Sequence, residues 1–339
     1  ASARVQNRKQ DGERAMNFRD RLQQIQKDAS AKPQGMQRFE TWRGLLAECR
    51  RKPTKRRVHA LRVVTLRLAA EVDQWLKGPG AGPIADHAGK RWSKQAEKLR
   101  YALSEVRETD VHLARLESLR PSLSEEAGYQ PRSSRLCLRQ IDVLQRKLRQ
   151  ERRSAAKQLT ADIEARQGRL ESVSREIESK IAAEPSTPSA AASKTVFREW
   201  ETVAAEFPAL KEEGLHDFRK HIKNVRYRAE LLAADDAQIA KLGDTLKGMQ
   251  NAIGEWHDWD ALARLAERKL RGRNKDGGLS EMLATMTEES LQRALDFCES
   301  RIAQLHAMSN GDAQNSMNIP QKFPAEREEL PAARTRRSA

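Results

Sequence analysis

One segment with strong helical character, His216 to Glu230, gathers a histidine and several cations on one side. At ~100° per residue, seven of its side chains fall within roughly a third of a turn. They are His216, Arg219, Lys220, Lys223, Arg226, Tyr227 and Glu230. Arginine binds phosphate oxygens through paired hydrogen bonds, lysine adds a mobile point charge, and histidine can donate to a phosphate oxygen. This cationic side therefore predicts an anion-binding site, and its mixture of cations suits a flexible chain of phosphates.

A matching segment begins at His59 in the first half of the chain. His59-Ala60-Leu61-Arg62 returns as His216-Asp217-Phe218-Arg219, 157 positions later, and residues 102–110 parallel residues 252–260, 150 positions later. The common order and similar offsets predict a duplicated unit. A single histidine is more often a core residue that bonds to a backbone group. Because both histidines precede an arginine by three positions, binding and structural roles are about equally supported.

The composition favours a polyanionic partner. The chain has 339 residues, with 63 Lys and Arg against 48 Asp and Glu, and a formal net charge of +15. Such an excess suits nucleic acid, anionic lipid or polyphosphate and does not choose among them. Eight of these cations lie between Arg50 and Arg67, with no acidic residue among them. A run of this kind is ordinarily a solvated face or a disordered arm, but here it leads into the helix of His59.

Helices must position these residues, because apolar side chains recur at helical spacing and strand patterns are absent. We therefore expect an all-α fold. Pro53-Thr54 separates the first two helices, and residues 134–181 suggest an antiparallel helical pair with Gly168 as its joint or as a tolerated interior glycine. The other expected helices cover residues 36–48, 55–76, 92–119, 196–207, 215–233, 239–270 with an internal break near Trp256, and 279–307.

Changes in composition divide the chain. We expect a charged N-terminal arm, loosely attached or marginally helical, over residues 1–35. Repeat one covers about 36–184, a linker covers 185–193, repeat two covers about 194–307, and residues 308–339 form a disordered tail. Cys49, Cys137 and Cys298 lack metal-ligand spacing and sit in amphipathic segments, which predicts buried, reduced thiols.

The segment from His216 to Leu232 resembles the hallmark helix of the CHAD family, the conserved histidine alpha-helical domain. In that helix a histidine leads an arginine, a lysine, an Arg-Tyr pair and a glutamate; here these are His216, Arg219, Lys223, Arg226, Tyr227 and Glu230. Residues 59–67 resemble the partner helix of the first repeat, although Leu66 stands where the family usually has an arginine. Residues 99–116 and 246–265 resemble later helices of the family. There Ser104 replaces the usual glycine, Glu108 replaces the usual aspartate, and His257 stands where asparagine is common.

The resemblance covers roughly residues 36–307 and implies two pseudo-symmetric four-helix bundles. It also implies binding of inorganic polyphosphate on basic surfaces formed by the histidine-bearing helices and their neighbours. By resemblance, the polyphosphate-binding candidates are His59, Arg62, Arg67, His216, Arg219, Lys223 and Arg226, followed by Arg107 and Lys247 on neighbouring helices. Tyr227 and Glu230 would orient the cations. Because of Leu66, we expect the helix of His216 to contribute more of the binding.

One pattern suggests an enzyme instead. Glu176-Ile177-Glu178-Ser179-Lys180 matches the Glu-x-Glu-x-Lys pattern of triphosphate tunnel metalloenzymes, whose catalytic domain often accompanies this helical one. That chemistry needs a strand, where alternate carboxylates share a face and hold a metal, whereas residues two apart on a helix diverge. Since the surrounding periodicity is helical, we expect a chance match. His257, Asp258 and Asp260 suggest a metal cluster, but helix capping is the interpretation we favour.

We therefore expect a non-enzymatic protein, without cofactor or metal, that binds long-chain inorganic polyphosphate along a basic groove formed by the two histidine-bearing helices. The alternative is a nucleic-acid-binding or scaffold protein that uses the same surface, and a phosphohydrolase ranks third. The opening residues are too polar for a secretory signal, and no apolar run approaches the ~20 residues of a membrane span. We expect a cytoplasmic location, with polyphosphate or polyester granules as a further site by family analogy.

Overall fold

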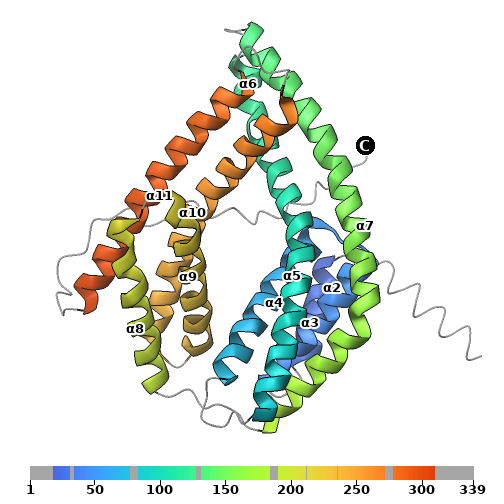
Figure 1. Cartoon of the computed structure of the whole chain (residues 1–339), viewed down its shortest axis with the longest axis vertical. Coiled ribbons are helices and arrows are strands. Elements are labelled where there is room, and N and C mark those ends of the chain that lie inside the picture. The colour runs from blue at the N-terminus through green and yellow to red at the C-terminus, as the bar shows by residue number, and fades with distance from the viewer. Residues whose placement is uncertain are drawn as a thin grey trace, which may run out of the picture. The chain divides into compact units, whose positions relative to one another are not determined.

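The computed structural model describes residues 18–30, 34–76, 83–126, 131–183, 190–210, 212–234, 236–271 and 278–309. Its elements are α2 (Phe18–Ser30), α3 (Gln34–Arg51), α4 (Lys55–Leu76), α5 (Pro83–Ser118), α6 (Arg120–Glu126), α7 (Pro131–Ala183), α8 (Ala190–Glu206), the 3₁₀ turn η1 (Phe207–Ala209), α9 (Glu212–Leu232), α10 (Ala237–Leu270) and α11 (Leu279–Ser309). Every element assigned in these ranges is a helix (Figure 1), which confirms the all-α prediction.

The chain forms two compact units. The first unit contains Ala1–Ser189 and Leu262–Met282, and the second contains Ala190–Ala261 and Leu283–Ala339. The end of α10 and the start of α11 thus belong to the first unit. Residues 185–189 of the expected linker and the tail from residue 310 lie outside the described residues, whereas residues 190–193 of that linker begin α8. The duplication into two pseudo-symmetric bundles stays a prediction.

The core of the first unit is built from α3, α4, α5 and α7. Trp42 of α3 meets Trp92 of α5 edge to face, with ring centroids 5.1 Å apart. The Trp42 indole N–H donates to Thr65 Oγ1 of α4 over 3.0 Å, so this buried polar group is satisfied. Ile177 of α7 is fully buried in the same core. These contacts fix α4 and α5, which carry the first-half candidate residues.

The junction between α3 and α4 follows from the predicted interruption at Pro53-Thr54. α3 ends at Arg51, and α4 begins at Lys55. Thr54 satisfies the start of α4, because its Oγ1 accepts the Arg57 N–H over 3.4 Å and its carbonyl accepts the Val58 N–H over 2.9 Å. This interruption is confirmed, and it sets the position of His59 on the second turn of α4.

The expected loose arm contains a packed helix. Phe18 and Leu22 of α2 lie against the core of the first unit, and Arg21 Nη1 is 2.8 Å from Glu48 Oε1. Residues 18–30 therefore form a helix, the second of the two interpretations that the sequence allowed, while residues 1–17 lie outside the described residues. The many charged residues of this segment made its narrow apolar stripe difficult to recognise from the sequence, and tertiary contacts partly bury that stripe.

α7 is a single helix of 53 residues, so the expected helical pair over residues 134–181 was wrong. Gly168 is exposed, and a Cβ added there would meet no atom within 4 Å. It is the tolerated interior glycine that the sequence allowed as the second interpretation. An isolated glycine costs a helix only about 1 kcal/mol, which packing of the long apolar stripe offsets.

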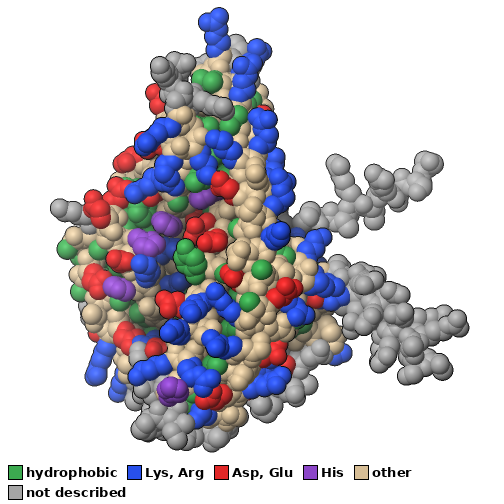
Figure 2. Space-filling view, turned by 45° about the vertical axis from the view of Figure 1, so that its right-hand side comes forward, with side chains coloured by type: hydrophobic (Ala, Val, Ile, Leu, Met, Phe, Trp, Pro, Cys, Tyr) green, Lys and Arg blue, Asp and Glu red, His purple; other side chains and the backbone are tan. Residues whose placement is uncertain are grey.

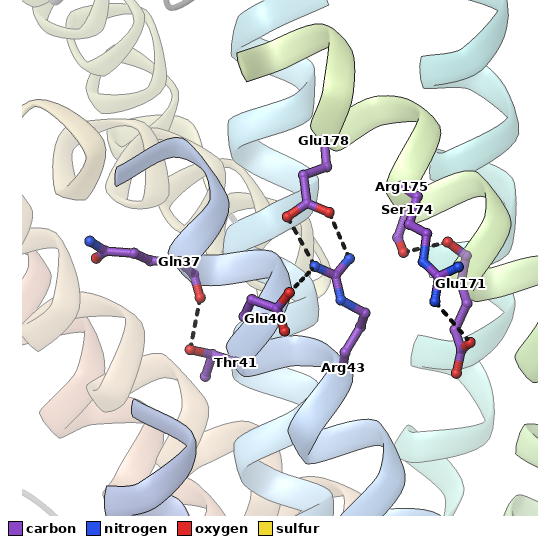
Figure 3. Close-up of polar contacts among 8 residues, drawn as sticks. All are labelled: Gln37, Glu40, Thr41, Arg43, Glu171, Ser174, Arg175 and Glu178. Carbon is purple, nitrogen blue, oxygen red and sulfur yellow. Dashed lines mark hydrogen bonds and ion pairs between the residues drawn. The ribbon is translucent and has the colours of Figure 1, made fainter. Parts of the chain in front are cut away.

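The Glu-x-Glu-x-Lys pattern lies within α7 and is helical, as expected. Its two carboxylates point to different neighbours. Glu178 accepts hydrogen bonds from both terminal nitrogens of Arg43 on α3, at 2.8 and 2.9 Å (Figure 3). Glu176 pairs with Arg91 of α5 over 3.2 Å. Both carboxylates therefore make contacts between helices.

Near its N-terminal end, α7 contacts the junction between α10 and α11, which belongs to the first unit. The Gln140 side-chain oxygen accepts the Leu279 N–H at the start of α11 over 2.9 Å. Gly278, just before it, has a φ of +66°, and a Cβ there would lie 3.0 Å from the same oxygen. Glycine is the residue that adopts this left-handed conformation at little cost.

The core of the second unit is built from α8, α9, α10 and α11, with Phe218, Ile222, Leu246 and Cys298 among its buried residues. α10 is continuous, so the expected break near Trp256 was wrong. Trp256 is itself buried in this core, and that packing overrides the mixed local sequence.

Two further expectations concern single groups. Cys49, Cys137 and Cys298 are buried and free, as predicted, and burial raises the pKa of Cys49 and Cys298 to about 12. None of the helices in the described parts of the chain combines the length and the apolar character needed to span a membrane.

Candidate functional site

α9 and α10 form an antiparallel pair in the second unit. The imidazole rings of His216 and His257 meet at one end, with centroids 4.9 Å apart. Toward the other end, a Cβ on Gly243 would lie 3.6 Å from the Cβ of Ala229. This register places the cationic side of α9 along one face of α10.

Arg219 lies against the backbone of α10. Its Nε donates to the carbonyl of Gln250 over 3.4 Å, and a Cβ on Gly254 would lie only 3.1 Å from its Nη2. Burial lowers the pKa of Arg219, while the carboxylate of Asp258, one turn further along α10, opposes that shift. Gly254 thus provides the space for this guanidinium, and Asp258 supports its charge.

His216 forms a pair with His257, which was not among the predicted site residues. His216 Nδ1 is buried and has no hydrogen-bond partner among the described residues. Burial lowers the pKa of His216, and the nearby charges of Lys220 and Arg219 lower it further, while Asp217 opposes them. The departure from asparagine at position 257 was the sequence signal, but the contact itself required the register of the two helices.

Arg226 is buried, with 7% of its surface exposed, rather than open to a ligand. Its guanidinium stacks on the ring of Tyr227, 4.4 Å from the centroid, and lies 3.4 Å from the Glu230 carboxylate. These are the contacts expected of orienting residues, although the roles of Tyr227 and Glu230 stay predictions. Arg226 Nε is buried without a hydrogen-bond partner among the described residues.

The lysines occupy more open positions. Lys220 is exposed and pairs with Asp217 over 2.8 Å, and Lys223 is half-buried. Lys247 is exposed on α10, and the register of the helix pair places it level with Arg226. The structure therefore divides the predicted face into Arg219 packed on α10, a buried Arg226, and lysines in more open positions.

α4 and α5 form a similar antiparallel pair in the first unit. Arg62 Nε donates to Ser104 Oγ over 3.4 Å, and Ser104 Oγ donates to the Arg100 carbonyl over 2.9 Å. At the other end, a Cβ on Gly89 would overlap the Leu76 side chain, at 2.3 Å. The same register places His59 level with Arg107.

Arg62 and Arg219 stand in corresponding surroundings. Each follows a histidine by three residues, each touches a small residue of the paired helix, and each is near an acid one turn further on. The small residues are Ser104 and Gly254, and the acids are Glu108 and Asp258. Desolvation raises the pKa of Glu108, while Arg62 opposes that rise. The two pairs match the offsets of 157 and 150 positions found in the sequence.

The first-half face carries fewer cations at the site. Leu66, where the family usually has an arginine, is buried, and Arg67 and His59 are exposed. Part of the cation run between Arg50 and Arg67 is structural, because Arg57 lies buried 2.7 Å from Glu48, which also pairs with Arg21. The buried carboxylate of Glu48 was not recognised from the sequence.

His257, Asp258 and Asp260 lie inside α10, so their interpretation as helix caps was wrong. Within the described ranges, no group of three or more His, Cys, Asp or Glu residues is arranged to hold a metal ion.

These observations define a class of protein: an all-helical unit in which a histidine leads the cationic side of a helix. The sequence matches the model of the CHAD domain family over residues 37–267, and the chain belongs to this family. A search of curated proteins gives no significant match.

Proposed function

We propose that the chain binds long-chain inorganic polyphosphate, without changing it chemically, through the cationic faces of α9 with α10 and of α4 with α5. The observation that carries the proposal is the placement of Arg219 against Gly254. A guanidinium held in this way is pre-oriented, so less entropy is lost when it binds phosphate. Family membership supports the same ligand class.

The distribution of charge favours a chain over a single phosphate. The more open cations of α9 extend from His216 to Lys223, which spans about 10 Å along the helix axis. Lys220 and Lys223 lie beyond Arg219 along this side of the helix, so a ligand must be extended to meet these cations together. Each bound phosphate releases condensed counterions, and affinity should therefore fall steeply with salt and rise with chain length.

A nucleic-acid partner is the second candidate, because the same field attracts any polyanion. Single-stranded nucleic acid is usually held by exposed aromatic side chains on which bases stack. Among the described residues the only exposed large hydrophobic side chain is Tyr101 on α5, at 71%. This favours a ligand without bases.

Competition at matched ionic strength tests the proposal. Labelled long-chain polyphosphate is bound to the protein and challenged with duplex DNA at equal phosphate concentration. Polyphosphate should remain bound, and displacement by DNA would contradict the proposal. Incubation of polyphosphate with the protein and Mg²⁺ or Mn²⁺ should release no phosphate; release would favour a phosphohydrolase.

The variant Lys220→Gln/Lys223→Gln removes two cations of the α9 face that do not belong to the core. We expect it to weaken polyphosphate binding about tenfold. Arg169→Gln/Arg175→Gln on α7 is the matched control, because it removes the same charge from exposed positions far along another helix. Equal losses in both variants would mean that only net charge matters. Cytoplasmic and granule locations belong to the same proposal and can be checked with a fluorescent fusion.

A further inference from the structure

The first half of α7 exposes a row of cations that the proposed site does not use. The members, called the arginine row below, are Arg132, Arg135, Arg139, Arg146, Arg149, Arg153 and Lys157, and all are exposed. Arg132, Arg139, Arg146 and Arg153 recur at every seventh position. In Figure 2, Lys and Arg side chains follow one another down the upper right-hand edge of the view, the side along which α7 runs in Figure 1.

Helix geometry aligns these side chains. At ~100° per residue the row falls within about 100° of the helix circumference, and it extends about 37 Å along the axis. The opposite side of the same stretch is apolar and buried, with Ile141, Leu144 and Leu148 inside the protein. The row is therefore one continuous exposed face.

The first half of α7 carries a strong excess of positive charge. Residues 132–157 contain nine Lys or Arg and two acids, whereas residues 158–183 of the same helix contain four Lys or Arg and five acids. Both acids of the first half are engaged outside the row: Asp142 pairs with Arg120, and Glu151 pairs with Lys269. An ordinary solvated face mixes both signs, as the second half does.

The row has little part in holding the fold. The other cations of this stretch make contacts between helices: Arg152 binds Asp110 over 3.1 Å, and Lys147 donates to the Lys269 carbonyl over 2.8 Å. Within the row, Arg146 Nε donates to the backbone carbonyl of Asp142, and Arg149 Nη2 donates to the side-chain oxygen of Gln145, each one turn earlier on α7. No member pairs with a carboxylate within 4.0 Å among the residues that the structure describes.

We propose that the arginine row is a second binding surface for linear polyphosphate, and this rests on the proposed function. Six of its seven members are arginines, whose planar forks hold phosphate oxygens through two hydrogen bonds. A membrane surface is less suited, because a helix that lies in a bilayer interface needs an apolar face and that of α7 is buried in the core. The row offers no aromatic side chain for base stacking.

Two surfaces on one chain give long polymers an advantage. A polyphosphate that occupies one surface raises the local concentration of the rest of the same polymer near the other, provided that the polymer is long enough to reach it. Tripolyphosphate gains nothing from the second surface. Preference for long chains is then a property of both surfaces together.

The row variant Arg132→Gln/Arg139→Gln/Arg146→Gln/Arg153→Gln tests this. Its control, Arg166→Gln/Arg169→Gln/Arg175→Gln/Lys180→Gln, removes four charges from the mixed half of the same helix. We expect the row variant to bind long-chain polyphosphate about tenfold more weakly, with a log–log salt slope smaller by about 3, and tripolyphosphate as the unaltered protein does. The control should change long-chain affinity by less than about twofold, and circular dichroism melting verifies that both variants fold.

The outcomes are separable. Unchanged long-chain affinity in the row variant, or an equal loss in the control, overturns the second surface. Retained polyphosphate binding with lost binding to duplex DNA or to anionic vesicles assigns the row to that partner and also overturns it. Failure of the proposed function gives a different result: Lys220→Gln/Lys223→Gln would then leave polyphosphate binding unaltered, whatever the row variant does.

Discussion

Arg219 and Gly254 face each other across α9 and α10, and a Cβ on the glycine would lie 3.1 Å from Nη2 of the arginine. The missing side chain lets the guanidinium lie along the α10 backbone, where its Nε reaches the Gln250 carbonyl over 3.4 Å. Arg62 makes the corresponding contact with Ser104 in the first unit. A small residue at this point of the paired helix is a condition for placing each arginine.

Gly254→Ala should separate stability from binding. Alanine in a helix interior stabilises by about 0.5–1 kcal/mol relative to glycine, while its methyl group displaces Arg219 by a few tenths of an ångström. We expect unchanged or higher thermal stability with several-fold weaker polyphosphate binding. Gly168→Ala is the matched control, because it meets open space on α7 and should raise stability without changing binding. Equal affinity in both variants would remove Gly254 from the site.

The histidine pair predicts a pH dependence of stability. The pKa of His216 lies below its ordinary value of 6.5, because burial, Lys220, Arg219 and Lys223 outweigh Asp217. The unfolded state therefore binds the proton more readily, and the free energy of unfolding falls as the pH drops below 6.5 toward the lowered pKa. Urea unfolding at pH 7.5 and 5.5 measures this; His216→Gln should lose less stability over that interval than the unaltered protein.

A bound polyanion should reverse that shift. Phosphate oxygens near His216 would favour the imidazolium, so binding takes up protons and tightens as the pH falls below neutrality. Calorimetric titrations in buffers of different ionisation enthalpy count the protons directly. His257→Asn, which introduces the residue common in the family, reports whether the second ring shares the uptake. Binding without proton uptake in the unaltered protein would contradict this prediction.

Arg226 should matter for stability more than the neighbouring lysines do. Its buried guanidinium lies on Tyr227 and against Glu230, and both contacts are lost in Arg226→Ala. We expect a loss of about 1–3 kcal/mol in the free energy of unfolding. Lys220→Gln should change stability by less than about 0.5 kcal/mol. Chemical denaturation compares the two variants, and equal free energies of unfolding would mean that Arg226 does not stabilise the fold.

Glu48 should be among the most sensitive acidic residues of the first unit. Its carboxylate lies 2.7 Å from buried Arg57 and 2.8 Å from Arg21, so Glu48→Gln leaves these cations without their counter-charge. Removing one member of a buried ion pair costs about 3–5 kcal/mol. Glu164→Gln, at an exposed position of α7, is the control and should alter the melting temperature little. A small change in Glu48→Gln would show that α2 adds little to the fold.

Sequence periodicity predicted where the helices lie, but it did not predict correctly which of them are continuous. The helices of His59 and His216 and the interruption at Pro53 were predicted correctly, because helical spacing and a missing N–H act locally. The joint at Gly168 and the break near Trp256 were not found, since packing along α7 and around Trp256 outweighs weak local propensity.

The sequence alone determined the helical class, the family and the cationic side of α9, because these depend on residue types and on a fixed helical period. Only the tertiary structure decided how that side is used. Arg226 is buried, and the antiparallel register of α9 and α10 places Arg219 on Gly254 and brings His257 to His216. Register depends on the packing of distant apolar residues, which no local pattern around His216 specifies.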